Sequence, residues 1–209
     1  MPLYKTITVD ENTNILIWKI EESFDWLSDG ILLTDTCQQR VDNMKSDIHR
    51  RGFMSIRHLL AIANYTDHDL FYDEFGKPHL SDGRFISITH SFIFTAIIIS
   101  DKPVGIDIEK QREKIERIAH KFVASEAEFV ASNEQKVRAL TVIWGAKESL
   151  YKLYATPGLS FEQHIDIVPF DLNMPFTAGC INYRNEISYY TISFMEFEGF
   201  TCVYAQPYN

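Results

Sequence analysis

Residues Gly105-Ile106-Asp107-Ile108-Glu109 alternate acidic and apolar side chains, which is the pattern of a β-strand with two different faces. In a strand, Ile106 and Ile108 share one face. Asp107 and Glu109 share the other, with their Cα atoms roughly 7 Å apart. Taken alone, an acidic face of this kind is most often the solvated side of an antiparallel sheet. The fold must therefore give this strand either water or a positively charged partner on its acidic side.

A second segment, Trp144-Gly145-Ala146-Lys147-Glu148-Ser149-Leu150-Tyr151-Lys152, lies in a helical pattern. Glu148 and Lys152 are one helical turn apart and are neighbours on one face. Such a pair is most often a surface contact worth roughly 0.2–0.5 kcal/mol. If this face meets the acidic face of the strand, three carboxylates and an ammonium converge. That set of groups suits a hard divalent cation that holds phosphate oxygens.

Composition limits the class of protein. The chain has 209 residues, of which 45% are hydrophobic and 13% aromatic, and this content predicts a folded core rather than disorder. Its 20 basic and 29 acidic residues give a net charge of −9, which argues against nucleic acid as the main partner. A highly phosphorylated small molecule remains compatible with this charge if the basic groups are clustered.

Cysteine usage and hydropathy predict a cytoplasmic protein. The three cysteines are odd in number and widely spaced, so neither a disulfide framework nor a zinc site is indicated, and reduced core residues are expected. The N-terminal residues lack the apolar core of a signal peptide, and no apolar run approaches the length of a membrane span.

Hydrophobic periodicity predicts an α+β fold. Helical spacing runs over residues 38–65, 115–120, 125–131 and 135–154, and strand-like runs cover 15–20, 85–90, 94–100, 104–109, 165–168, 180–183, 188–194 and 200–205. Ser125 and Glu128 resemble a capping box. This order suggests two α+β halves, 1–103 and 104–209, with a boundary near Pro103 and no obvious sequence repeat between them.

Four motifs occur in a fixed order: Gly76-Lys77-Pro78, then Ile86-Ser87-Ile88-Thr89-His90-Ser91, then Gly105 to Glu109, then Trp144-x-x-Lys147-Glu148-Ser149-x-x-Lys152. In this order they resemble the 4′-phosphopantetheinyl transferases, specifically the larger single-chain type that activates surfactin synthetase. The resemblance extends upstream to Lys45-x-x-x-His49-Arg50 and downstream to Gly158-Leu159-Ser160, and so covers about residues 45 to 160.

The resemblance implies both a fold and a reaction. Members of this family share two similar α+β halves related by a pseudo-two-fold, with coenzyme A in the cleft between them. They move the 4′-phosphopantetheine arm of coenzyme A to a serine of an apo acyl, peptidyl or aryl carrier protein and release 3′,5′-ADP, which is holo-acyl-carrier-protein synthase chemistry. Mg²⁺ is the implied cofactor. A two-halved chain has little need of self-association, so a monomer is expected.

The resemblance also assigns residues to the catalytic end of the site. Lys152 would contact the phosphate oxygens and assist the leaving ADP. Either Glu109 or Glu148 would be the general base that takes the proton of the carrier serine. The Mg²⁺ ligands would be the three carboxylates Asp107, Glu109 and Glu148. A glutamate expected after the Phe122 region aligns with Ala127, so the choice between its neighbours Glu126 and Glu128 stays open.

The remaining assignments concern the nucleotide end of coenzyme A. Thr89, where the family usually has serine, and His90 would contact the 3′-phosphate. Arg50, together with Lys45 and Lys77, would bind the nucleotide phosphates or the adenine end. Each of these residues also has an ordinary structural interpretation, as a hydrogen-bonded histidine, a turn lysine or the wet face of a helix.

The basic stretch after the strand motif is a candidate docking surface for an acidic carrier protein. A solvated helix of mixed charge explains it equally well. The stretch comprises Lys110, Arg112, Lys114, Arg117 and Lys121.

Two other functions fit the same residues. A metal-dependent nucleotide phosphodiesterase or pyrophosphatase could use the three carboxylates, although it would not need a carrier-docking surface. An inactive relative could bind coenzyme A and recruit carrier domains without turnover.

Overall fold

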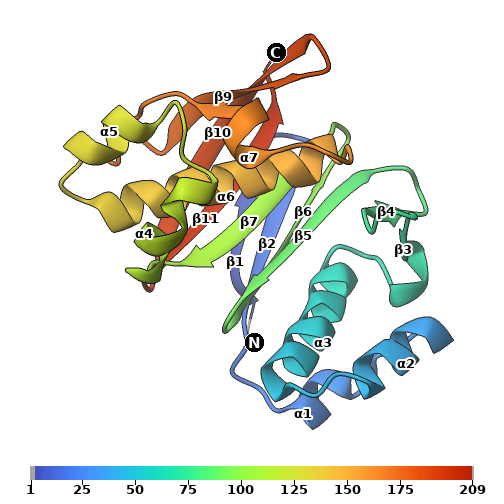
Figure 1. Cartoon of the computed structure of the whole chain (residues 1–209). Helices are drawn as coiled ribbons and strands as arrows, with labels where there is room; N and C mark the ends of the chain where they lie inside the picture. The colour runs from blue at the N-terminus through green and yellow to red at the C-terminus, as the bar shows by residue number, and fades with distance from the viewer. Residues whose placement is uncertain (1–2, 209) are drawn as a thin grey trace. The chain divides into compact units, whose positions relative to one another are not determined.

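The computed structural model describes residues 3–208, and its contacts divide the chain into two compact units that meet at the junction of Asp101 and Lys102 (Figure 1). Each unit consists of an antiparallel sheet and packed helices, so the chain has the predicted α+β class. Within residues 3–208, no helix combines the length and the apolar character that crossing a membrane requires.

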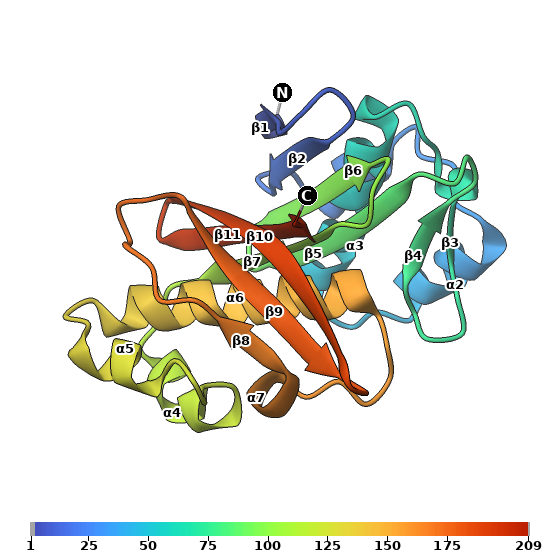
Figure 2. The same cartoon turned by 90° about the horizontal axis from the view of Figure 1, so that it is seen from above.

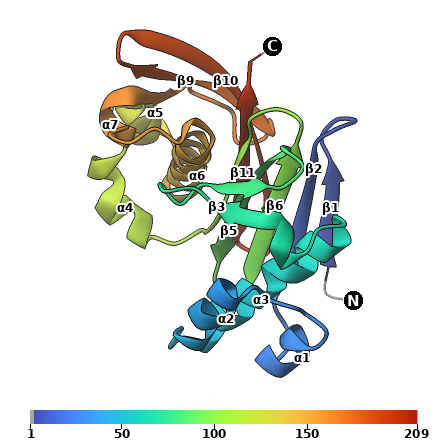
Figure 3. The ribbon, with the colours of Figure 1, turned by 90° about the vertical axis from the view of Figure 1, so that its right-hand side faces the viewer.

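The N-terminal unit contains a six-stranded sheet in the order β1-β2-β6-β5-β4-β3. Its strands are β1 (Leu3–Thr8), β2 (Asn14–Lys19), β3 (Leu70–Tyr72), β4 (Pro78–Leu80), β5 (Phe85–Ser91) and β6 (Phe94–Ser100). Figure 3 shows its helices α1, α2 and α3 together. Their bounds are α1 (Phe24–Ser28), α2 (Asp35–Asp42), α3 (Asp47–Ile62) and the 3-10 turn η1 (Asp67–Asp69).

The C-terminal unit contains a five-stranded sheet in the order β7-β11-β10-β9-β8, with α6 running along it (Figure 2). Its strands are β7 (Gly105–Lys110), β8 (Ile165–Ile167), β9 (Phe176–Tyr183), β10 (Glu186–Phe197) and β11 (Phe200–Pro207). Its helices are α4 (Lys114–Ile118), η2 (Ala119–Lys121), α5 (Ala127–Ser132), α6 (Lys136–Tyr154) and α7 (Phe161–His164).

The two units share one connectivity. In each, a strand (β2 or β7) is followed by the unit's longest helix (α3 or α6) and then by four strands, the last of which returns to pair with the first. The order β2-β6-β5-β4-β3 thus matches β7-β11-β10-β9-β8, and all pairs are antiparallel. Each unit also has its own hydrophobic core. The predicted similarity of the two halves is therefore a similarity of topology.

Two local predictions were wrong. The continuous helix over 38–65 is broken between α2 and α3, because Ser46 has an extended backbone with φ −90° and ψ 121°. The capping box at Ser125 and Glu128 is absent: α5 begins at Ala127 without a side-chain cap, and the Ser125 hydroxyl donates instead to Asp166 Oδ1 at 2.5 Å. A tertiary contact thus replaced the predicted local one.

Helix α6 lies very close to strands β7 and β11. A Cβ atom placed on Gly105 would lie 1.9 Å from the Ser149 carbonyl oxygen, and one on Gly145 would lie 2.7 Å from Val203 Cγ2. Ser149 also donates its hydroxyl to the Val203 carbonyl at 3.0 Å. The helix can approach the sheet this closely only because glycine occupies both positions.

A buried ion pair organises the helices of the N-terminal unit. Arg57 on α3 pairs with Asp67 at 2.7 Å, and both side chains are almost fully buried. Asp67 Oδ2 also accepts hydrogen bonds from the backbone and hydroxyl of Thr34, the N-cap of α2, at 2.8 and 3.0 Å. Burial raises the pKa of Asp67, but the Thr34 backbone bond and the Arg57 charge outweigh it and lower the pKa below its ordinary value.

We predict that Gly105→Ala destabilises the protein by about 3 kcal/mol or more, because the new methyl group meets backbone that cannot rotate away. Urea unfolding at equilibrium measures the change. Gly52→Ala on α3 is the matched control: its Cβ would meet its nearest neighbour at 3.7 Å, and alanine favours helix, so no loss of stability is expected there. An equal loss in both variants would contradict the close approach.

The Asp67 pair predicts a stability that depends on pH. Since the folded pKa lies below the ordinary value of 3.8, the contribution of Asp67 is complete above that pH and disappears as the pH falls through the folded pKa. Asp67→Asn should therefore lower stability at pH 7 and flatten the acid limb of the stability curve. Glu74→Gln, which changes an exposed carboxylate of the same unit and leaves Arg57 paired, is the control. An unchanged acid limb in Asp67→Asn would contradict this role.

Candidate active site

Strand β7 and helix α6 place an aspartate and a lysine of the two motifs in direct contact. Asp107 is 5% exposed, and Lys152 Nζ lies 2.7 Å from its Oδ1 and 2.9 Å from the Ile106 carbonyl oxygen. A Cβ atom on Gly145 of α6 would lie 3.9 Å from Asp107 Oδ2. The acidic face of β7 is therefore covered by α6 rather than solvated.

Glu109 lies at the half-buried end of this face. Its Oε1 accepts a hydrogen bond from Trp144 Nε1 at 3.2 Å. Trp144 is itself fixed by aromatic neighbours, because its ring centroid lies 5.0 Å from that of Phe122 and 5.4 Å from that of Phe161. Burial, followed by the charge of Asp107, raises the pKa of Glu109. The motif tryptophan thus orients a candidate catalytic carboxylate.

Among the three carboxylates, Glu148 has the largest shift of its pKa. Burial raises its pKa to about 7, with further contributions from the charges of Asp107 and Glu109 that Lys152 only partly offsets. Carboxylates that repel one another in a half-buried place are chemically suited to a hard divalent cation, which takes carboxylate oxygens as ligands. The donor set therefore fits Mg²⁺.

The arrangement of the side chains differs from a formed metal site. Among residues 3–208, no three His, Cys, Asp or Glu side chains are grouped closely enough to hold a metal ion as they lie. Within this cluster, the ammonium of Lys152 contacts Asp107. The set Asp107, Glu109 and Glu148 thus stays a prediction as metal ligands, although the three side chains interact electrostatically.

The second lysine of the helix motif has a different role. Lys147 is fully buried, and its Nζ lies 2.8 Å from Glu126 Oε1, 2.7 Å from the Phe122 carbonyl oxygen and 3.0 Å from the Phe161 carbonyl oxygen. Burial lowers the pKa of Lys147, and the hydrogen bond and charge of Glu126 oppose this shift. Glu126 also accepts the Ile167 backbone N–H at 2.9 Å.

Of the two glutamates that the resemblance left open, Glu126 is the one that pairs with Lys147. Glu126 is 1% exposed and is the buried partner of Lys147, whereas Glu128 is exposed on α5. The ion pair joins α6 to the segment before α5, to α7 and to β8. We did not predict this role of Lys147 from the sequence. The signal that could have revealed it is that the residues one helical turn before and after Lys147 are apolar or aromatic, which places its side chain on a buried face of the helix.

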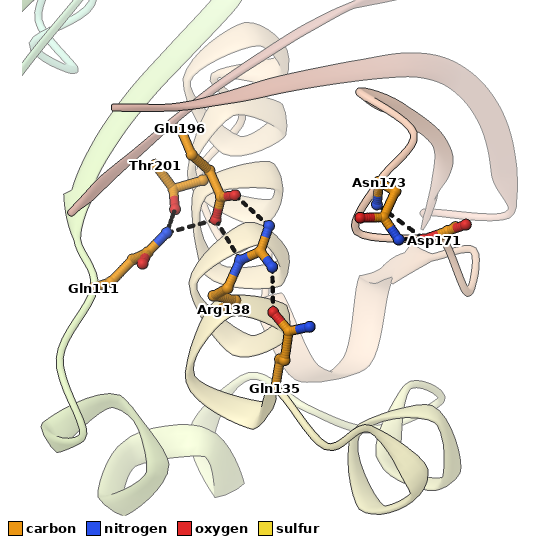
Figure 4. Close-up of polar contacts among 7 residues, drawn as sticks. All are labelled: Gln111, Gln135, Arg138, Asp171, Asn173, Glu196 and Thr201. Atoms are coloured by element: carbon orange, nitrogen blue, oxygen red, sulfur yellow. Dashed lines mark hydrogen bonds and ion pairs between the residues drawn. The ribbon is translucent and has the colours of Figure 1, made fainter. Parts of the chain in front are cut away.

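A polar network fixes the chain where it leaves β7 (Figure 4). Arg138 on α6 forms a two-pronged ion pair with Glu196 on β10 and also donates to Gln135. Gln111, two residues after Glu109, donates to Glu196 and to Thr201 Oγ1, the latter at 3.0 Å. These contacts hold the start of the basic stretch against the β10–β11 hairpin.

A hollow of about 190 Å³ lies beside Glu109. Three cations of the basic stretch line it, and the five basic residues of that stretch are all exposed. The lining residues are Glu109, Lys110, Arg112, Lys114, Ile115, Ile118 and Trp144.

The N-terminal unit contains a separate pocket of about 280 Å³ that includes His90. The His90 ring meets His49 edge-on at 5.8 Å, whereas the preceding residue, Thr89, is buried and is not among the described residues that line the pocket. Arg40 and Arg57 supply positive charge to the lining. The pocket is lined by residues of α2, α3, β3 and β5.

The other predicted nucleotide contacts are not among the described residues that line this pocket. Arg50 on α3 stacks its guanidinium 3.8 Å from the Phe24 ring centroid, and Lys45 is exposed before α3. Lys77 is half-buried in the β3–β4 turn, where burial lowers its pKa. The structure therefore gathers Asp107, Glu109, Glu148 and Lys152 in one unit, and places Thr89 and His90 in the other.

Comparisons with known proteins match part of this chain to the family that its motifs resemble. The family model of the 4′-phosphopantetheinyl transferase superfamily matches residues 103–200. The 4′-phosphopantetheinyl transferase gsp of Aneurinibacillus migulanus is 30% identical over 154 residues, which cover 70% of this chain and 62% of gsp. The chain thus spans less than two thirds of that relative. An alignment of this length exceeds the stretch from Lys102 to the C-terminus, so it includes part of the N-terminal unit.

Among solved structures, the chain is similar to the holo-[acyl-carrier-protein] synthase of Thermotoga maritima. The TM-score is 0.42 at 17% identity, over 49% of this chain and 61% of that one.

We predict that Lys147→Met and Glu126→Gln each destabilise the protein by about 3–5 kcal/mol, because each single change leaves an uncompensated group in the buried pair. The double variant should lose less than the sum of the two. Equilibrium unfolding of all three variants measures the coupling. Lys136→Met, an exposed lysine of the same helix, should change stability by no more than about 0.5 kcal/mol. Strict additivity would contradict the pairing.

Proposed function

We propose that the protein transfers the 4′-phosphopantetheine arm of coenzyme A to an apo carrier protein, because residues 103–200 match the family model of the 4′-phosphopantetheinyl transferase superfamily and the chain is 30% identical to gsp over 154 residues. The observation that carries this proposal is the acidic cluster of β7 and α6, with Lys152 bound to Asp107 at 2.7 Å. The cluster combines carboxylates for a cation with an ammonium for phosphate oxygens. The similarity to gsp supports the larger type of transferase.

The reaction exchanges one P–O bond for another. The serine oxygen of the carrier forms a bond to the phosphorus of the pantetheine phosphate, and the bond from that phosphorus to the bridging oxygen breaks. The bridging oxygen leaves with 3′,5′-ADP, and the serine proton passes to Glu109 or Glu148. Phosphoryl transfer of this kind needs positioning and charge stabilisation more than a covalent enzyme intermediate.

Lys152 is placed to stabilise the charge of the phosphates. An ammonium has three N–H groups, and two of those on Lys152 bind the Ile106 carbonyl and Asp107. These two bonds orient the ammonium, so its remaining N–H can reach a phosphate oxygen without further ordering of the side chain. Lys152 is in this proposal an electrostatic catalyst held by Asp107.

Asp107, Glu109 and Glu148 would hold Mg²⁺. When bound, Mg²⁺ supplies charge neutralisation of the diphosphate. The raised pKa values of Glu109 and Glu148 support this assignment, because burial and, after it, the charge of neighbouring carboxylates disfavour the ionised forms, and a bound divalent cation would offset both effects. Trp144 keeps Glu109 turned toward this cluster.

The carrier protein would dock on the basic stretch beside the cluster. Lys110, Arg112 and Lys114 line the hollow next to Glu109 and are all exposed, so an acidic helix could meet them while its serine approaches the carboxylates. This placement supports transfer over simple hydrolysis, which requires no protein-docking surface. In the N-terminal unit, Thr89 and His90 would contact the 3′-phosphate of coenzyme A, with Lys45, Arg50 and Lys77 as further nucleotide contacts.

The test is incubation of the protein with coenzyme A, Mg²⁺ and a panel of apo acyl, peptidyl and aryl carrier proteins, followed by intact-mass spectrometry. We expect one phosphopantetheine to be added to a carrier, with an equal amount of 3′,5′-ADP released. Release of ADP without modification of any carrier would instead indicate a nucleotide hydrolase. Coenzyme A binding without either product would indicate an inactive relative.

We predict that Asp107→Asn lowers kcat/KM for transfer by about a hundredfold or more, because it removes a charge from the cation site and the partner that orients Lys152. Glu186→Gln on β10, an exposed carboxylate of the same unit, is the control and should retain activity. Chelation of divalent cations should abolish transfer, and added Mg²⁺ should restore it. Wild-type activity of Asp107→Asn at saturating Mg²⁺ would contradict the assignment.

A further inference from the structure

A second cavity of the N-terminal unit has no part in the proposed transfer. Its volume is about 850 Å³, within the usual size range of small-molecule sites. It lies at the end of β2, beside α1 and the C-terminal half of α3, and shares no lining residue with the His90 pocket. The lining residues are Leu3, Trp18, Glu21, Glu22, Trp26, His58, Ala61 and Ile62.

Three aromatic rings form one wall of this cavity. The His58 ring stacks on Trp18 at 5.0 Å and on Trp26 at 5.3 Å, and the two tryptophans are 6.5 Å apart. His58 Nε2 lies 2.9 Å from the Leu27 carbonyl oxygen, which fixes the ring between α3 and α1. Trp18 is 3% exposed and forms the buried part of the wall, whereas Trp26 is 50% exposed and presents its ring to the cavity mouth. The wall is therefore preformed.

Among the described residues that line the cavity, Glu21 and Glu22 are acidic and none is lysine or arginine. Glu22 Oε2 is fixed by hydrogen bonds from Trp18 Nε1 and from the Glu21 backbone, both at 3.2 Å. A carboxylate is thus held at the edge of the aromatic wall.

Two nearby cations have partners in this region. Lys19 pairs with Glu21 at 3.3 Å and offsets part of its charge. Arg51 is directed to the Glu22 carbonyl oxygen at 3.2 Å and to Asp47 at 2.9 Å. None of these contacts involves the Glu22 carboxylate, which accepts its hydrogen bond from Trp18.

We infer that this cavity binds a small organic cation, a substituted ammonium on an apolar body. The faces of indole rings attract cations, and this attraction is strongest for tryptophan and where the cation is partly desolvated. The Glu22 carboxylate adds a Coulomb attraction. Leu3, Ala61 and Ile62 provide apolar surface for the body of the ligand. Phosphorylated and other anionic molecules would be repelled, so this site differs in chemistry from the proposed coenzyme A site.

The test uses two cationic probes, choline and benzyltrimethylammonium, with 3,3-dimethylbutan-1-ol as the neutral isostere of choline. Binding to the full chain is measured by calorimetry and by quenching of tryptophan fluorescence. We expect both cations to bind and the neutral isostere to bind at least about tenfold more weakly. Failure of both cations to bind, or equal binding of choline and its isostere, would overturn the inference.

Two variants locate the site. Trp26→Leu keeps an apolar side chain but removes the ring, and Glu22→Gln keeps an acceptor for Trp18 but removes the charge. Each should weaken binding of the cations by about five- to tenfold. The matched controls are Tyr189→Leu and Glu74→Gln, an exposed aromatic and an exposed carboxylate elsewhere, which should bind as the wild type does. Wild-type affinity in both site variants, with their folding verified by thermal melts, would place any binding elsewhere and overturn the inference.

Discussion

The close contact between helix α6 and strand β7 sets the geometry of the C-terminal unit. Gly105 allows it, and Gly145 allows the adjoining contact of α6 with β11, because a methyl group on Gly105 would collide with Ser149 of α6 and one on Gly145 with Val203 of β11. The consequence is chemical as well as structural. The helix covers Asp107, excludes water from it and brings Lys152 within 2.7 Å of its carboxylate. With a wider gap, the same residues would be an ordinary solvated strand face and a surface helix pair, and neither would have the electrostatics of a site.

The motif on α6 carries structural residues on one face of the helix and candidate catalytic residues on another. Glu148 and Lys152 face the strand carboxylates, whereas Lys147 points into the core and pairs with Glu126. Trp144 connects the two functions, since it packs on Phe122 and donates to Glu109. A buried ion pair of this kind contributes little net stability compared with an apolar core, yet breaking it is costly. Its effect here is to fix where the segment before α5 and strand β8 meet the helix that carries the site.

The two units have the same topology but different sequences, and different kinds of side chain lie beside their long helices. The C-terminal unit places carboxylates beside its long helix, and the N-terminal unit places histidines and arginines beside its own. In the N-terminal unit, the buried pair of Arg57 and Asp67 fixes α2 relative to α3, because Asp67 also accepts a hydrogen bond from the backbone of Thr34, the N-cap of α2. That unit carries, in addition, the aromatic cavity of Trp18, Trp26 and His58, which has no counterpart among the predicted contacts for coenzyme A.

Local periodicity was enough to determine the elements that carry the site. Alternation places Asp107 and Glu109 on one strand face, and a four-residue spacing places Glu148 and Lys152 on one helix face, because both patterns depend only on the backbone repeat. Tertiary structure alone decided that Asp107 is buried, that the pKa of Glu148 rises to about 7, and that Ser125 binds Asp166 rather than capping α5. It also decided the pairing of Glu126 with Lys147. These outcomes depend on how closely elements distant in sequence approach one another, and a local pattern carries no information about that distance.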